Sequence, residues 1–503
     1  MKKLYLSLLL CLIALSGFAQ TNGNLQYLGD KAILQVWGTH YQRGHAQGYL
    51  LGDAVLDVFN QYYYTMVTNS DPVYYNFMWS YYQEHFDTDP RLLSEAQGLI
   101  AGLQDAGVNL FHSGLGRNLA AEDLLLANAI VDMLLVRRAF ALDDLEIGCA
   151  SLSSWGVSTA QDSLLAGSSV ITRFLDWSQN TALIGNPLLV VHHPAEADEQ
   201  EWLSFTWPGF IGALSAISAS ETSAWLNMGN DHSAPNPQNL SPVAQDLRRG
   251  IERLDINADG NSDALDVYAA ISGGTHLSGT IIHALSEGAL GIIPLVAETN
   301  NSGTALRYYD NNGNLPGNHL AATNHFRVLA NLTCCTRYAN IQDSLIANHH
   351  MTAKRQWSLL SGAAGLETNL SAMQYTPSTG YILWSSATLS LPAYQSPAQT
   401  LSATALFDYP VAVDDALMPG PEWNVACWPN PLNRSSSLNV KSSQPFAAYQ
   451  VFNLRGQKVA AGKFDQDKTE LGLNLPDLPS GLYMLRLSGR NGETAQKKIV
   501  LSN

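Results

Sequence analysis

A cysteine, an arginine and an aspartate stand close together in the sequence, in an arrangement that suits nucleophilic chemistry. Cys149 follows Gly148 in the stretch EIGCASLSSWG, and Arg173 and Asp176 follow in RFLDW, with Arg173 24 residues after the cysteine. If the two stretches form a hairpin, a cation and a carboxylate return beside the thiol. A neighbouring guanidinium favours the thiolate and lowers the thiol pKa. The spacing therefore predicts an activated thiol at Cys149.

A second stretch has the spacing of a metal-binding loop. Residues 255–266 read DINADGNSDALD, with oxygen side chains at loop positions 1, 3, 5, 9 and 12, Gly260 at position 6 and a backbone carbonyl expected at position 7. This pattern indicates an EF-hand-type loop for a structural calcium ion, with an aspartate in the last position, and it resembles a single dockerin loop. An Asp/Asn-rich turn is the alternative. The predicted ligands are Asp255, Asn257, Asp259, Asn261, Asp263 and Asp266.

The surrounding sequence alternates between stretches typical of helices and of strands. A strand is predicted at 31–38, KAILQVWG, and a helix follows it in HYQRGHAQGYLLGDAVLDVF. Apolar spacing predicts a second helix at 92–107. From Cys149 onward, short alternating runs between turn residues predict an antiparallel sheet, and helical stretches flank the calcium loop. The aromatic stretch 62–86 is interpreted as helices that pack through aromatic faces, with an apolar substrate wall as the alternative.

The two ends of the chain differ from its middle. MKK, the apolar run LYLSLLLCLIALSG and a small-residue site ending at Ala19 fit a signal peptide over residues 1–19. No later stretch approaches the roughly 20 apolar residues of a transmembrane segment, so the mature protein is expected to be soluble and exported. From Asn424 the chain holds ten basic and five acidic residues, against 17 and 38 before it. This step indicates a domain boundary, and the acidic main body argues against nucleic acid and anionic membranes as partners.

Cysteine is scarce in this chain of 503 residues. Cys11 leaves with the signal peptide, and Cys149, Cys334, Cys335 and Cys427 remain. Adjacent cysteines rarely bridge each other, because the geometry is strained. The protein is therefore not expected to be held by disulfides, although a bond from Cys334 to Cys149 or Cys427 stays open as an alternative.

The last 80 residues, 424–503, follow a linker predicted at 406–423. Short strands between Asn-Pro, Arg-Gly and Asn-Gly turns predict a small β-sandwich. WPNP, NLRGQKV, GLYMLRL and Lys497-Lys498 follow one another in an order that resembles the C-terminal sorting domain of the type IX secretion system of Bacteroidetes. The resemblance implies passage through the periplasm, recognition by the type IX machinery and release or display at the cell surface. A generic carbohydrate-binding β-sandwich is the alternative.

Four stretches carry a second resemblance. They are GTHYQRG at 38–44 followed by Gln47-Gly48, the segment from Cys149 to Trp177, ATNHF at 322–326, and Arg337-Tyr338. Together they resemble cysteine N-terminal-nucleophile (Ntn) hydrolases of the acyl-CoA:6-aminopenicillanate acyltransferase-like group, which is related to choloylglycine hydrolases. The resemblance covers roughly residues 30–400. It implies an α+β fold, a four-layer αββα sandwich over residues 149–405, preceded by a pro-segment or small subunit at 20–148.

The resemblance also implies autocatalytic scission between Gly148 and Cys149. The freed α-amine, with a pKa of about 7.7–8.0, would be a general base on the nucleophile itself. Arg173 would lower the thiol pKa, and Asp176 would accept hydrogen bonds from the amine. Asn324 would donate to the oxyanion of the tetrahedral intermediate. A structural ion pair is the alternative for the arginine and the aspartate.

Three further expectations complete this site. Arg337 would order the network or steer a substrate carbonyl or carboxylate, with a surface charge as the alternative. Asn227, in SAWLNMGN, is a second oxyanion candidate, with a turn residue as the alternative. Gly148 would let the thiol approach its carbonyl and would tolerate strained backbone. No organic cofactor is implied.

The expected function is that of an exported, autoprocessed cysteine amidohydrolase. It would cleave a linear N-acyl amide through an S-acyl enzyme at Cys149, with transfer to an amine as a variant of the same chemistry. The alternative is a non-catalytic, calcium-binding surface or glycan-binding protein in which Cys149 is buried and inert. A Ser-His-Asp hydrolase is disfavoured, because the chain has no Gly-x-Ser-x-Gly elbow.

Overall fold

The computed structural model divides into two compact units, Met1–Val411 and Ala412–Asn503. The described residues are 21–139, 148–229, 238–308, 315–329, 335–409, 425–433, 437–453, 458–475, 478–490 and 494–502. The predicted signal peptide, Cys334 and most of the predicted linker lie outside the residues that the structure describes.

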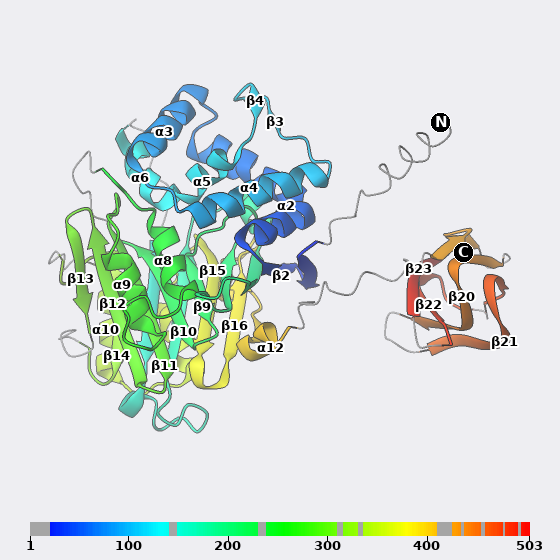
Figure 1. The fold of residues 1–503 in the computed structure, drawn as a ribbon. Helices are drawn as coiled ribbons and strands as arrows, with labels where there is room; N and C mark the ends of the chain where they lie inside the picture. Colours follow the sequence, from blue (N-terminus) through cyan, green and yellow to red (C-terminus); the bar gives the residue numbers. More distant parts are fainter. Residues whose placement is uncertain are drawn as a thin grey trace. The chain divides into compact units, whose positions relative to one another are not determined.

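Two β-sheets form the centre of the first unit (Figure 1). Nine strands pair in the order β1-β2-β7-β8-β9-β10-β11-β12-β13, and six pair in the order β14-β5-β6-β15-β16-β17. The neighbours pair antiparallel, except that β2 and β7 are parallel. The nine are β1 (Gly23–Leu28), β2 (Lys31–Gly38), β7 (Leu188–Pro194), β8 (Trp202–Thr206), β9 (Ser215–Ser218), β10 (Thr222–Met228), β11 (Thr280–Gly288), β12 (Gly291–Asn300) and β13 (Gly303–Arg307). The six are β5 (Gly148–Ser154), β6 (Val170–Asp176), β14 (His319–Ala322), β15 (Asn369–Thr376), β16 (Tyr381–Ser386) and β17 (Gln399–Ser402).

Side-chain alternation explains why these strands are buried on both faces. Successive residues of a strand point to opposite faces of its sheet. In β7, Leu189 and Val191 join a core cluster between the sheets with Met373 and Trp384 of the six-stranded sheet. Their neighbour Val190 belongs instead to the cluster that contains the helices. The two sheets therefore pack face to face, with helices against their outer faces.

Helices supply the outer layers. α8 (Val243–Glu252) and α9 (Ala264–Ser272) pack on strands of the nine-stranded sheet, and α10 (Thr336–Ala347) and α11 (Ala353–Ala364) pack on the six-stranded sheet. On that side Phe174 of β6 contacts Trp357 of α11, with ring centroids 5.6 Å apart. The α+β class and the αββα layering predicted from the sequence are confirmed. The short α7 (Thr181–Gly185) and α12 (Ala403–Phe407) complete this part.

The N-terminal segment forms its own group of helices, and local capping explains where they start. Thr39 accepts from the backbone N–H of Gln42 and Gln42 accepts from Thr39 N–H, a capping box that begins the first helix. Asp71 and Asp89 each cap a helix whose first residue is proline. The predicted strand at 31–38 is confirmed, and the predicted helix at 92–107 lies at 90–105. The helices are α2 (His40–Asp57), the π-helix η1 (Val58–Val67), α3 (Pro72–His85), α4 (Pro90–Asp105), α5 (Ala121–Asn128) and α6 (Ile130–Ala139).

The second unit is all β, as predicted. Its strands pair in the order β18-β20-β22-β23-β19, with β21 on β20. Alternate residues such as Val440, Val451 and Leu485 are buried in its core. The strands are β18 (Val425–Trp428), β19 (Leu432–Asn433), β20 (Leu438–Asn453), β21 (Lys458–Leu473), β22 (Gly481–Ser488) and β23 (Thr494–Ser502).

Candidate active site

The cysteine, the arginine and the aspartate lie on one hairpin, as the spacing predicted. β5 and β6 pair antiparallel, with Gly148 opposite Asp176 and Ser151 opposite Arg173. Cys149 is the second residue of β5 and is only 1% exposed. The hairpin therefore places both charged residues beside the Gly148–Cys149 peptide bond.

Alternation along β5 turns the thiol toward the nine-stranded sheet. Cys149 Sγ donates to the backbone carbonyl of Leu226 in β10 at 3.6 Å. Arg173 Nη2 lies 3.5 Å from the sulfur and also donates to the Leu226 carbonyl, while Nη1 donates to Ser215 Oγ at 2.5 Å. The guanidinium is fully buried, so it is held against the thiol by two acceptors of the opposite sheet.

Asp176 lies on the other face of β6, because it stands three positions after the arginine on the strand. Its Oδ2 accepts from Arg337 Nη1 at 2.7 Å, and its Oδ1 accepts from Asn369 Nδ2 at 3.0 Å. Arg337 stands at the start of α10 and Asn369 at the start of β15. Arg173 and Asp176 thus each have their own hydrogen-bond partners.

Asn324, just after β14, contacts both Cys149 and Arg337. Its Oδ1 accepts from the backbone N–H of Cys149 at 3.1 Å and also from Arg337 Nη2. Its Nδ2 donates to the carbonyl of Met228 at 2.8 Å. In the continuous chain the Cys149 nitrogen thus bonds to the asparagine, whereas the resemblance implies that Asp176 holds it as the free amine.

Three polar side chains lie close to Gly148. A Cβ at Gly148 would lie 3.1 Å from Arg337 Nη2, 3.4 Å from Asn324 Oδ1 and 3.5 Å from Asp176 Oδ2. The φ of Gly148 is not in the left-handed region, so the tolerance of strained backbone that was expected of this glycine is not needed. Only the contact with the end of the flexible Arg337 side chain is tighter than an ordinary van der Waals contact, so the space beside Gly148 does not by itself require glycine.

Asn227 faces the same interior space from β10. Its Nδ2 donates to Ser151 Oγ at 3.1 Å, and its buried Oδ1 has no hydrogen-bond partner within the described part of the chain. Ser151 Oγ in turn lies 2.9 Å from His283 Nδ1, and Ser153 Oγ lies 2.9 Å from Nε2 of the same ring. Burial lowers the pKa of His283 to about 3, so this ring is neutral.

Burial dominates the protonation of the reacting groups. It raises the pKa of the Cys149 thiol, although the charge of Arg173 opposes the shift. Burial also raises the pKa of Asp176 to about 6 against the attraction of Arg337. It lowers the pKa of Arg173 as well. The predicted attraction of Arg173 for the thiolate is present, but it does not outweigh desolvation in the intact chain.

Sequence reasoning missed three members of this site. Ser215 and the Leu226 carbonyl hold Arg173, and Asn369 holds Asp176. No local pattern marks any of them, since Asn369 is brought in by the pairing of β15 with β6, and Ser215 and Leu226 by the packing of the two sheets.

The loop between α8 and α9 has the turns that the calcium pattern requires. Gly260, at position 6, has φ +88° and donates its N–H to Asp255 Oδ1 at 3.0 Å. Asn257 N–H donates to Asp266 Oδ1 at 3.1 Å, which joins the start of the loop to its last predicted ligand. Asp263 begins α9 as its N-cap. Asp259 and Asn261 lie at the exposed tip, where the aspartate accepts from Asn261 N–H at 2.9 Å.

The cysteines that the structure describes, Cys149, Cys335 and Cys427, are free thiols. The prediction of a protein that is not held by disulfides is confirmed for these residues.

Comparison with solved structures returns two kinds of amide hydrolase. A Caenorhabditis elegans N-acylethanolamine-hydrolyzing acid amidase ortholog is 16% identical, with 46% of this chain and 93% of that chain covered and a TM-score of 0.34. A variant of the conjugated bile acid hydrolase from Clostridium perfringens is 8% identical, covers 51% of this chain and 93% of that one, and has a TM-score of 0.31. Because these values are low, the αββα assignment rests on the sheets and helices of the chain itself.

A curated relative matches part of the chain. Protein dcd1B of Dictyostelium discoideum is 26% identical over 218 residues, and the match spans 39% of each protein. The chain thus covers about two fifths of the length of that relative.

The second unit has a direct family match. Residues 426–502 match the family of secretion system C-terminal sorting domains. Among the described helices, none is both long enough and apolar enough to cross a membrane. The predicted type IX sorting domain is confirmed, and with it the prediction of a secreted or surface-displayed protein. The chain therefore carries, at residues 426–502, a secretion system C-terminal sorting domain.

Proposed function

We propose that the first unit is an autoprocessed cysteine amidohydrolase that acts on a linear N-acyl amide through an S-acyl enzyme at Cys149. The observation that carries this proposal is the gathering of Arg173, Asp176, Asn324 and Arg337 around one Gly–Cys peptide bond. An inert structural cysteine would not require a buried guanidinium against its sulfur. Perturbed titratable groups of this kind concentrate at functional sites.

The first reaction would be scission of the chain. The thiol of Cys149 loses its proton and attacks the carbonyl carbon of Gly148, the C–N bond breaks, and a thioester forms while the cysteine nitrogen gains a proton. Water then hydrolyses the thioester and frees the thiol. Arg173 favours the thiolate by its charge, and Asp176 and Arg337 hold the glycine side of the bond in place.

Turnover would use the new N-terminus. The α-amine of Cys149 takes the thiol proton, the thiolate attacks the amide carbonyl of the substrate, and the leaving amine receives the proton. Asn324 Nδ2 and Asn227 Nδ2 are the candidate donors to the oxyanion, once each exchanges its present acceptor. Water, or an amine in the transferase variant, then releases the acyl group.

Two small apolar hollows lie near the site. Leu175, the cross-strand partner of Cys149, lines a hollow with Leu183, Trp207 and Leu370. Trp207 also lines a second hollow, with Phe59, Tyr62 and Phe210. Tyr62 accepts from Trp177 Nε1 at 2.7 Å, which ties the aromatic N-terminal segment to the end of β6. Each hollow has a volume of only about 20 Å³, and aromatic rings of 62–86 such as Tyr63 and Tyr75 pack on one another in the core, which agrees with the interpretation of helices that pack through aromatic faces.

Intact-mass analysis of the secreted protein tests the proposal. Scission at Gly148–Cys149 gives a chain of 129 residues, 20–148, and a chain that begins at Cys149. A thiol-reactive acyl amide probe should label Cys149, and the Cys149→Ala variant should lose that labelling although its other cysteines remain. One continuous chain that takes up no probe would support the alternative, a non-catalytic calcium-binding surface or glycan-binding protein.

We also propose that residues 255–266 hold a structural calcium ion. The left-handed Gly260 and the hydrogen bond that joins Asn257 to Asp266 support this loop geometry. Burial and the charges of Asp266 and Asp259 raise the pKa of Asp263, and a bound cation would offset that repulsion. Calcium titration monitored by thermal unfolding tests it.

A further inference from the structure

A buried cluster of charges lies where the N-terminal segment meets the part of the unit that follows Cys149. We call these eight side chains the ionic seam. Four come from α2 and α4 before the predicted scission point, and four come from α8 and the turn after β7. They are His40, Arg43, Arg91 and Glu95 on the first side, and Glu196, Glu199, Arg248 and Glu252 on the second.

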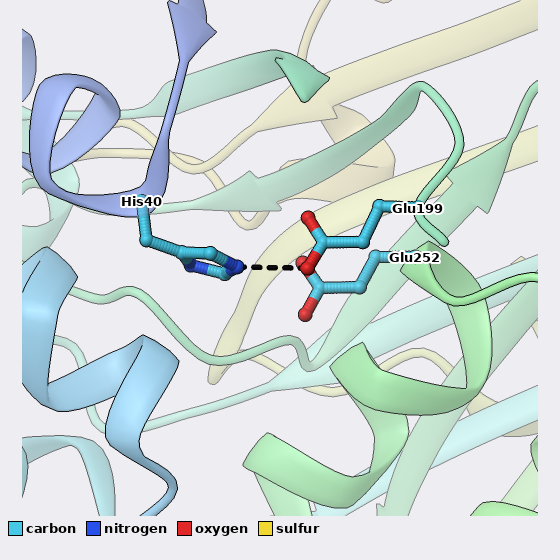
Figure 2. A group of neighbouring side chains, drawn as sticks. All are labelled: His40, Glu199 and Glu252. Atoms are coloured by element: carbon cyan, nitrogen blue, oxygen red, sulfur yellow. Dashed lines mark hydrogen bonds and ion pairs between the residues drawn. The ribbon is translucent and has the colours of Figure 1, made fainter. Parts of the chain in front are cut away.

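His40 stands at the centre of the seam. Its Nδ1 lies 2.8 Å from Glu95 Oε2 and its Nε2 lies 2.9 Å from Glu199 Oε1, and all three side chains are buried. Figure 2 shows the ring directed from the start of α2 toward Glu199 and Glu252. Both ring nitrogens thus face carboxylates, which is the environment of an imidazolium.

Three arginines join the two sides of the seam. Arg43 Nη1 donates to Glu196 at 2.9 Å and Nη2 to Glu199 at 3.1 Å. Arg91 also donates to Glu199. Arg248 Nη2 donates to Glu95 at 2.7 Å. Each of these bonds links a residue before the scission point to a residue after it.

Close helix packing sets this geometry. A Cβ at Gly44 of α2 would lie 1.9 Å from the carbonyl of Glu95, and a Cβ at Gly98 of α4 would lie 2.0 Å from the carbonyl of Tyr41. Only glycine permits such an approach of two helix backbones. α2 and α4 lie side by side in Figure 1, and their contact brings His40 to Glu95.

The charges of the two sides are complementary. With His40 protonated, the first side carries three cations and one carboxylate, and the second carries three carboxylates and one cation. Separation would break the ion pairs that compensate these charges and would leave a net charge of +2 on the first side and −2 on the second. His40, Glu199 and Glu252 could geometrically hold a divalent cation, since their ligand atoms lie within 4.8 Å of one another. The arginines already bond these carboxylates, so a proton on His40 completes the balance.

We propose that the ionic seam is the interface that keeps the two chains together after scission, and that the proton on His40 sets its strength. The retention of two chains rests on the proposed function. The proton dependence of the seam does not, because the same contacts exist in the continuous chain.

The groups that face His40 determine the sign of the pH effect. They are Glu95 and Arg91 of α4, Arg248 and Glu252 of α8, Arg43 of its own helix, Glu199, and His192 of β7, whose pKa is held well below its usual value by burial and Arg248. Burial acts to lower the pKa of His40, but Glu199 and Glu95 overcome it and raise the pKa. The stabilisation is therefore complete below about pH 6.5 and is lost as the pH rises through the raised value.

The experiment compares His40→Gln with His45→Gln. His45 lies on the same helix, but its ion pair with Asp105 stays within the N-terminal segment and is largely exposed on the aspartate side. In the processed protein, native mass spectrometry and gel filtration should show both chains together at pH 5.5. Release of the 129-residue chain, 20–148, should rise several-fold between pH 5.5 and 8.5, as His40 loses its proton. His40→Gln should release it at both pH values, and His45→Gln should behave as wild type.

A second arm uses the uncut Cys149→Ala chain. Its unfolding temperature should fall from pH 5.5 to 8.5 by roughly 2–4 °C more than that of the His40→Gln, Cys149→Ala double variant. Equal pH dependence of the two would overturn the seam proposal even if scission occurs. Absence of scission would overturn the proposed function alone. The uncut chain would still show whether the proton on His40 sets the strength of the ionic seam. A rise in unfolding temperature with Zn²⁺ or Mn²⁺ that His40→Gln abolishes would also overturn the proposal, because it would make the cluster a metal site.

Discussion

The candidate active site and the ionic seam are both buried and both built from charged side chains, yet their surroundings shift pKa values in opposite directions. Around Cys149, burial outweighs the neighbours and raises the pKa values of the thiol and of Asp176. In the seam the partners outweigh burial. Arg248 and His40 hold the pKa of Glu95 well below its usual value, and His40 helps to lower that of Glu199 to about 2.

The number of partners accounts for the difference. Glu199 is bonded by His40, Arg43 and Arg91, whereas the thiol of Cys149 has one cation and one carbonyl. A buried group whose charge is offset by several partners stays ionised and stabilises the structure. A buried group with fewer partners has a pKa that is shifted toward its neutral form. Glu252 is the exception within the seam, because burial and the repulsion of Glu199 raise its pKa despite Arg248.

The largest predicted effect is the loss of the proposed nucleophile, Cys149. Cys149→Ala should abolish scission and reduce turnover by on the order of 10⁶-fold, since it removes the nucleophile. Intact-mass analysis should find one continuous chain. Cys427→Ala, a free cysteine of the sorting domain, is the matched control and should be cut as wild type. Normal scission of Cys149→Ala would show that Cys149 differs in no way from a structural cysteine such as Cys427.

The second prediction tests whether the seam stabilises the fold. Arg248→Met should lower the free energy of unfolding by about 3–5 kcal/mol, because it leaves Glu95 and Glu252 buried without their cation. The neighbouring Arg249→Met should cost about 0–1 kcal/mol, since its pair with Asp246 is partly exposed. Denaturant unfolding of both variants in the uncut chain measures the difference. Equal losses of unfolding free energy in the two variants would show that Arg248 stabilises the fold no more than a partly exposed ion pair does.

The third prediction concerns the loop at 255–266, which is charged, has an exposed tip and lacks arginine partners among its described contacts. If it holds calcium, ion at about 100 times its dissociation constant should stabilise the unit by about 2.7 kcal/mol. Chelation with EGTA should remove this gain, and Asp255→Ala should no longer respond to calcium. Thermal unfolding with and without EGTA measures it. An unchanged curve for the wild type would contradict the metal assignment.

The smallest predicted effect is the pH dependence of scission. Asp176 is ionised only above about pH 6, because its pKa is raised by burial. If its carboxylate is needed to hold Arg337 beside the scissile bond, the scission rate should fall about tenfold for each pH unit below 6. Asp176→Asn should remove that step from the profile. Time courses at about pH 4.5–8 give the rates, and an unchanged profile in the variant would show that another group titrates.

Much of the candidate active site was predictable because its pattern is local. The distance from Cys149 to Arg173 and Asp176 matches one strand, one turn and one return strand, and the structure pairs them in that way. The partners Ser215 and Asn369 were not predictable. They reach the site only through β9 and β15, and nothing near them in sequence marks a catalytic neighbourhood.

The partners of the ionic seam were even less predictable from the sequence. The strand at 31–38 and the helix after it were predicted, and the pattern GTHYQRG was noted, yet His40 and Arg43 find partners more than 150 residues away. Local propensity decides where a helix begins and which face is apolar. It contains no information on which remote carboxylate will meet that helix.

Three features could be recognised without any structure: the Gly148–Cys149 bond, the calcium-type spacing and the sorting domain. Each of them is a pattern of residues that lie close together in the sequence. Which groups surround the thiol, and which charges compensate one another, follows from the folded arrangement alone. The order β14-β5-β6-β15 brings Asn324, Arg337 and Asn369 to the hairpin, and the packing of α2, α4 and α8 closes the seam. Those pairings arise from burying whole sheets and helices together, and that depends on the complete core.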